Sequence, residues 1–183
     1  MKTESQVMFI LRLTVTLLLI CVVMAAALAG VNSITAPKIA QLNYEKTQKA
    51  IEAVLPGGGD AVEGYTDETG LVSTVYQGEN GYAVEVAPSG FGGAITMMVG
   101  VDNEGNVAGI SVVSHAETAG LGDVAAAQTT VGEAFRAQFV GMNGTVSVAK
   151  DGGQVDEITS ATITSRAICA GVNAALACVA SMG

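Results

Sequence analysis

An uncharged apolar segment near the start of the chain constrains its structure more than any other feature. The segment covers residues 13–31 and reads LTVTLLLICVVMAAALAGV, which is 19 residues without a charge. A helix of about 20 apolar residues is long enough to cross a hydrocarbon core of about 30 Å. Arg12 directly precedes the segment, where its side chain can reach the lipid head groups. We therefore expect a transmembrane helix at residues 13–31, after a short cytoplasmic N-terminus at residues 1–12.

A cleaved signal peptide is the alternative interpretation of this segment. Ala27-Leu28-Ala29 has the small-x-small form of a cleavage site. The apolar run is, however, longer than the hydrophobic region of a typical signal peptide. Cys21 follows Ile20 rather than a small residue, so a lipoprotein site is not supported. An uncleaved anchor is the favoured interpretation.

The charges that flank the segment do not fix its orientation. Lys2 and Arg12 precede it, whereas Lys38, Lys46 and Lys49 follow it. A short N-terminal arm can stay in the cytoplasm while a long domain is translocated. We expect a single-pass protein of the cytoplasmic membrane, with its domain on the extracytoplasmic side.

Composition excludes several classes of function. The net charge is −9, which argues against a nucleic-acid partner. The chain has three cysteines and one histidine, His115, without a CxxC pair or a His/Cys cluster, so we expect no metal site. Cys169 and Cys178 are nine residues apart on an expected helix. That spacing separates them by about 13 Å on opposite faces, which favours two buried thiols over a disulfide.

The residues after the anchor predict one α+β domain with a mainly antiparallel sheet and packed helices. Helical spacing predicts a stalk or first helix within residues 32–55, ended by Pro56 and the glycines after it. The domain itself should occupy residues 56–183. Its expected strands are residues 71–77, 81–87, 94–101 and 107–114, with a turn at 102–106 and a further short strand at 144–148. Its expected helices are residues 124–139 and a last helix, capped by Thr159 or Ser160, that runs towards Ala180.

A run of Ser and Thr residues, DEITSATITSR at 156–166, precedes the last helix. One interpretation is an ordinary loop and helix cap, for which these residues are common. The other is a phosphate site, because a helix start offers free N–H groups and the positive end of the helix dipole. Arg166 lies one turn beyond Thr162 and can face the same group. A threonine hydroxyl is a poor nucleophile, so covalent attachment of a phosphate would require a separate enzyme.

Asp156, Thr159, Ala161 and Thr162 resemble the Dxx(S/T)GAT motif that a flavin transferase reads in FMN-binding domains. Such domains occur in the G subunit of the Rnf complex and in the C subunit of the sodium-pumping NADH:quinone reductase. The resemblance implies that Thr162 carries FMN through a phosphoester, with Thr159, Ser160, Ala161 and Arg166 beside it. Two longer segments also resemble the Rnf G subunit, GYAVEVAPSGFGGAITMMVGVDNEGNVAGISVVSHAETAGLG at 81–122 and KDGGQVDEITSATITSRAI at 150–168.

Two residues depart from the family pattern. Ser160 stands where the motif has Gly, and Ala119 stands where the HxETPGLG loop has Pro. A glycine there would serve a positive φ or a close approach of the transferase. The loop of residues 115–122 contains His115, an ordinary loop histidine by its spacing alone. The resemblance implies that this loop lies near the flavin or near a neighbouring protein of the complex, with the candidate contacts His115, Glu117, Thr118, Gly120, Leu121 and Gly122.

The function implied by the resemblance is electron relay within a ferredoxin:NAD⁺ oxidoreductase that moves Na⁺ or H⁺. Its partners would be the other Rnf subunits and, during maturation, a flavin transferase; no complete active site is expected in this chain alone. Three alternatives remain. They are the counterpart in the quinone reductase, a stand-alone extracytoplasmic flavoprotein reductase, and a binding module in which Thr162 is only a capping residue. If Thr162 is not modified, Thr159 and Thr164 are the next candidates.

Overall fold

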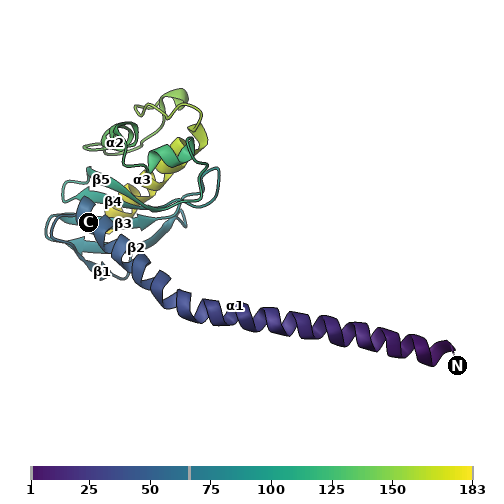
Figure 1. Cartoon of the computed structure of the whole chain (residues 1–183). Coiled ribbons are helices and arrows are strands. Elements are labelled where there is room, and N and C mark those ends of the chain that lie inside the picture. The colour runs from purple at the N-terminus through teal and green to yellow at the C-terminus, as the bar shows by residue number, and fades with distance from the viewer. Residues whose placement is uncertain (1, 66, 183) are drawn as a thin grey trace. The chain divides into compact units, whose positions relative to one another are not determined.

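A computed structural model describes residues 2–65 and 67–182, with side chains from Met8 onwards. The chain divides into two units, one up to Glu45 and one from Lys46. Figure 1 shows the order of the elements along the chain.

Helix α1 (Lys2–Val54) contains the whole apolar segment and continues past Pro37 without a break. Every residue from Met8 to Lys46 is exposed to solvent in the structure. A helix that is apolar all round needs an apolar environment, and the stretch Met8–Val54 is long and apolar enough to cross a membrane. This helix fits a membrane location. The predicted helix end is also confirmed, because α1 stops at Val54, directly before Leu55 and Pro56.

The sheet has five strands in chain order, and every neighbouring pair is antiparallel. This confirms the predicted sheet, and four of its strands agree with the sequence to within two residues at each end. The strands are β1 (Asp60–Val62), β2 (Val72–Gly78), β3 (Gly81–Val86), β4 (Thr96–Asp102) and β5 (Val107–Ser114). The sequence did not predict β1, because three residues are too few to display an alternating pattern.

The turn between β4 and β5 is the one that the sequence predicts. The Asp102 carboxylate accepts hydrogen bonds from the backbone N–H groups of Glu104 and Asn106, at 2.9 and 2.8 Å. The hydrogen bond from Asn106 is the main reason that the pKa of Asp102 is lowered. An ionised side chain therefore fixes this turn.

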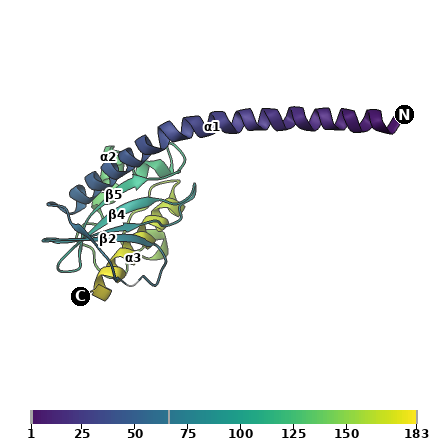
Figure 2. The same ribbon diagram turned by 90° about the horizontal axis from the view of Figure 1, so that it is seen from below.

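Helices cover both faces of the sheet (Figures 1 and 2). Helix α3 (Thr162–Met182) packs on one face, in a core that includes Val84, Val86, Ile168 and Val172. The last turns of α1 pack on the other face through Ala50, Ile51, Val54 and Leu55, which contact Ala83 and Met98. Gly100 permits this approach, because a Cβ there would strike the carbonyl oxygen of Val54. Cys169 and Cys178 are buried free thiols on α3, and burial raises the pKa of Cys169 to about 11.

Two predicted elements differ in the structure. Residues 124–139 do not form one helix, but a 3₁₀ turn η1 (Gly122–Ala125) and a shorter helix α2 (Thr130–Ala137). Thr129 caps the start of α2, because its Oγ1 accepts a hydrogen bond from the Gly132 N–H at 3.3 Å. Residues 144–148 are not a strand. Val148 makes only an isolated parallel bridge to Val155, and the 3₁₀ turn η2 (Ala149–Asp151) follows at once.

Candidate functional site

The first turn of α3 is held in place by a buried serine. The Ser165 Oγ accepts a hydrogen bond from the backbone N–H of Ile158 at 3.1 Å and donates one to the Ala161 carbonyl at 3.1 Å. The helix starts at Thr162, so the capping position belongs to Ala161. The expectation that Thr159 or Ser160 caps the helix is therefore wrong. Ser165 instead fixes the loop before the helix to its first turn, a role that spacing alone does not reveal.

Ser160 adopts a φ of 67°, the only positive φ of a non-glycine residue in the described part of the chain. This is the left-handed region, which glycine enters at little cost and other residues rarely enter. The position is the one at which the related motif has Gly. The backbone conformation is thus a sufficient reason for a glycine there, without a close approach by another protein.

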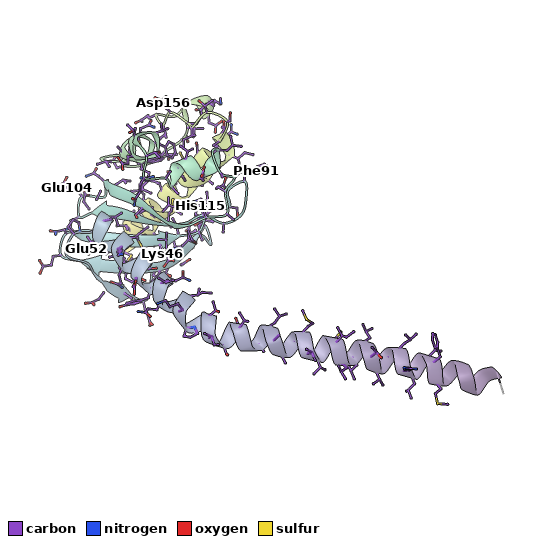
Figure 3. The ribbon with its side chains drawn as sticks, viewed as in Figure 1. Lys46, Glu52, Phe91, Glu104, His115 and Asp156 are labelled. Atoms are coloured by element: carbon purple, nitrogen blue, oxygen red, sulfur yellow. The ribbon has the colours of Figure 1, made fainter. Side chains whose placement is uncertain are left out.

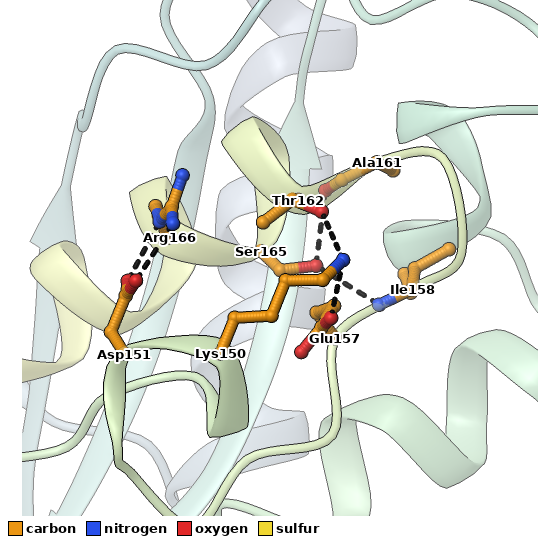
Figure 4. Close-up of polar contacts among 8 residues, drawn as sticks. All are labelled: Lys150, Asp151, Glu157, Ile158, Ala161, Thr162, Ser165 and Arg166. Atoms are coloured by element: carbon orange, nitrogen blue, oxygen red, sulfur yellow. Dashed lines mark hydrogen bonds and ion pairs between the residues drawn. The ribbon is translucent and has the colours of Figure 1, made fainter.

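Thr162 is half-buried, and its hydroxyl is contacted by a cation that no pattern in the sequence singled out (Figure 4). The Lys150 ammonium lies 3.2 Å from the Thr162 Oγ1 and 2.6 Å from a carboxylate oxygen of Glu157. The hydrogen bond from Lys150 lowers the pKa of Glu157, so this carboxylate stays ionised. Lys150 is distant in sequence and lies on η2, so only the fold brings it to Thr162. The single hint in the sequence is that Lys150 opens the segment that resembles the family's C-terminal signature.

Arg166 lies one turn beyond Thr162, but it is paired with Asp151. Its Nε and Nη2 each lie 2.7 Å from a different carboxylate oxygen of Asp151, a bidentate arrangement. The pairing lowers the pKa of Asp151 and raises the pKa of Arg166. The two cations near the helix start therefore have different partners, and Lys150 is the one that contacts Thr162 (Figure 4).

Glu117 joins two loops to the start of α3. One carboxylate oxygen accepts the backbone N–H of Gly92 at 3.0 Å, and the other accepts the buried Thr164 hydroxyl at 2.6 Å. A Cβ at Gly90 or Gly122 would strike this carboxylate, so both glycines leave room for it. The glycine-rich stretch around residue 90 is thus a loop between two antiparallel strands, packed around Glu117.

The other predicted site residues lie on the surface around this point. His115 is exposed, and its Nδ1 accepts the Glu117 backbone N–H at 3.3 Å. Asp156 is exposed at an outer edge of the domain, where its backbone N–H is held by the Gln138 side chain at 2.8 Å (Figure 3). Four further predicted site residues, in the loop of residues 115–122 and in the motif at 156–162, are also exposed: Thr118, Gly120, Leu121 and Thr159.

Large apolar side chains are exposed in the same three segments. Phe91 is 70% exposed, Ile163 is 51% exposed and Leu121 is 42% exposed. Glu117 holds the segments of Phe91 and Leu121 against the first turn of α3, in which Ile163 lies. A separate cleft of about 940 Å³ runs along the later part of α3, with Tyr82, Ala170 and Ala177 in its lining and none of residues 156–166.

The site thus combines a helix start, a hydroxyl, a cation and exposed apolar side chains, which can bind a phosphate and an apolar ring. Residues 90–177 match the FMN-binding domain family, which makes FMN the cofactor of this domain. The chain is 30% identical to the G subunit of the Na⁺-translocating ferredoxin:NAD⁺ oxidoreductase complex of Acetobacterium woodii, over 94% of this chain and 95% of that protein. It is 34% identical to the G subunit of the ion-translocating oxidoreductase complex of Methanosarcina acetivorans, over 87% and 88%. The corresponding protein of Stutzerimonas stutzeri is 32% identical, over 86% and 75%. The chain belongs to this family of G subunits.

Proposed function

We propose that this chain is an electron-relay component of a membrane-bound ferredoxin:NAD⁺ oxidoreductase that translocates ions, with FMN esterified through its phosphate to Thr162. One observation supports Thr162 as the attachment site. Thr162 is the first residue of α3 and is half-buried, and its hydroxyl oxygen lies 3.2 Å from the Lys150 ammonium. Membership of the G-subunit family supports the relay role, because the related complexes are oxidoreductases.

The residues around Thr162 fit a phosphate. The first backbone N–H groups of a helix have no partner within the helix, and the helix dipole adds partial positive charge at the same place. Lys150 adds a full positive charge. Bound FMN supplies one- and two-electron chemistry, while the protein holds the phosphate and positions the ring. Phe91, Leu121 and Ile163 offer apolar surface within the same group of segments.

The surroundings of the motif agree with maturation by a flavin transferase. Asp156 and Thr159 are exposed, so another protein can reach them in the folded domain, and Ala161 and Thr162 follow at the helix start. The apolar segment at residues 13–31 would anchor the chain as a single pass, with the domain outside the cytoplasm. Other proteins of the complex would then supply and accept the electrons.

The test is peptide mass spectrometry of the full chain co-produced with a flavin transferase, in wild type and in Thr162→Val. We expect the wild-type peptide to carry the mass of FMN minus one water on Thr162. The variant should carry none, because valine has no hydroxyl. Its melting temperature should change little, because only one partly exposed hydrogen bond is lost, worth about 1 kcal/mol or less.

Thr145→Val is the matched control, because Thr145 is an exposed threonine of the same domain outside the motif. It should be loaded like wild type. Covalent flavin on a folded Thr162→Val chain would move the attachment to Thr159 or Thr164. Folded and exported wild-type protein without flavin would contradict the proposed function.

A further inference from the structure

We infer that Lys150 is the counter-ion of the flavin phosphoester and orients the Thr162 hydroxyl before attachment. The inference rests on the proposed function and assigns a role to a residue outside the motif. It starts from one contact: the Lys150 Nζ lies 3.2 Å from the Thr162 Oγ1, the atom that would become the bridging ester oxygen.

Glu157 holds this ammonium in place. The side chain of Glu157 is only 13% exposed, whereas that of Lys150 is 58% exposed, and the two are 2.6 Å apart. A nearly buried carboxylate thus fixes the end of a long, otherwise mobile side chain beside Thr162. An ammonium carries three N–H donors. Two are directed to Glu157 and Thr162, and the third can reach a non-bridging oxygen of a phosphorus atom bonded to the same Oγ1.

Charge explains why a cation is useful at this position. The ester phosphate keeps one negative charge, which would otherwise lie close to the ionised Glu157 carboxylate. Lys150 stands between the two and separates like charges. Arg166 is less suited to this task, because Asp151 already engages its Nε and Nη2 at 2.7 Å. The structure therefore favours Lys150 over Arg166, the cation that the sequence indicated for this role.

The experiment compares Lys150→Met, Lys150→Arg and Arg166→Met in the full chain, co-produced with the transferase. Two quantities are measured: the initial rate of flavin loading at Thr162, by fluorescence and mass spectrometry, and the ³¹P NMR resonance of the loaded protein. Lys150→Met should load about threefold to tenfold more slowly, the effect of one partly exposed charge-assisted hydrogen bond. Its phosphorus resonance should move, because the nearest cation is gone.

The other two variants locate the effect. Lys150→Arg should restore most of the loading, because it keeps the charge. Arg166→Met should load like wild type and leave the phosphorus resonance unchanged. Normal loading and an unmoved resonance in Lys150→Met would overturn the inference, and so would a defect confined to Arg166→Met. A Lys150→Met chain that melts well below wild type and is not rescued by arginine would make Lys150 merely structural.

The wild-type chain keeps the two hypotheses apart. Wild-type protein that is folded but never takes up flavin would overturn both the proposed function and this inference. If wild-type protein is loaded with flavin and the Lys150 variants show the same loading rate and phosphorus resonance as wild type, the inference alone is overturned.

Discussion

At the scale of single residues, Ser160 stands in a conformation that suits glycine better. Its φ of 67° costs a residue with a side chain roughly 1–2 kcal/mol. We expect Ser160→Gly to raise the free energy of unfolding by about 0.5–1 kcal/mol, because the relief of strain exceeds the added freedom of the unfolded chain. Chemical denaturation of the two proteins measures the difference.

Thr159→Gly is the control for this prediction. Thr159 precedes Ser160 and has no positive φ, so glycine there should lower the stability. If both glycine variants are destabilised alike, the backbone at Ser160 is not strained.

The sequence predicts part of the site at this scale, and the limit has a physical reason. Helical periodicity correctly places Thr162 and Arg166 one turn apart at the helix start. It gives no information on Asp151 as the partner of Arg166, or on Lys150 as the partner of Thr162. These contacts depend on where η2 packs. Because η2 has no periodic sequence pattern, its position cannot be predicted from the sequence.

At the scale of elements, Glu117 connects the loops at residues 90–93 and 115–122 to α3. Glu117→Ala should lower the free energy of unfolding by about 2–3 kcal/mol, because it removes hydrogen bonds to a charged group and leaves the buried Thr164 hydroxyl without its acceptor. Thr164→Val removes the same contact from the other side. A double-mutant cycle should therefore give a coupling energy of about 1–2 kcal/mol between the two positions. Strictly additive effects would mean that the hydrogen bond contributes nothing to stability.

The regular elements follow from the sequence better than the connections between them. Four strands were predicted from the alternation of apolar and polar residues between glycine or polar turns. The folded structure keeps these strands. The stretch at 124–139 was predicted as one helix, yet Thr129 caps a shorter helix within it. A side-chain cap competes locally with helix continuation, and periodicity cannot decide that competition.

At the scale of the whole molecule, the last turns of α1 belong to the core of the domain. A chain that begins at Lys46 keeps Ile51, Val54 and Leu55 on the sheet, whereas one that begins at Pro56 loses them. Each large side chain contributes about 1.5–3 kcal/mol by burial. We expect the shorter chain to be less stable by about 5 kcal/mol or to remain unfolded, as measured by denaturation.

A chain that begins at Ser33 serves as the control. Residues 33–45 are exposed, so their presence should not change the stability of the domain relative to the chain from Lys46. Equal stability of the chains from Lys46 and Pro56 would show that the sheet does not need this helix.

The unbroken order of the sheet, β1-β2-β3-β4-β5, bears on how the domain is made. Each strand can pair with its predecessor as soon as it emerges, because no strand waits for a distant partner. Helix α3 follows all five strands in the chain and packs on one face of the sheet. The valine-rich face of the sheet therefore stays uncovered until α3 has been made and has packed on it, and Thr162, the first residue of α3, reaches its position only then. A sheet that lacks α3 presents this apolar face to other chains, which makes the incomplete domain prone to aggregation.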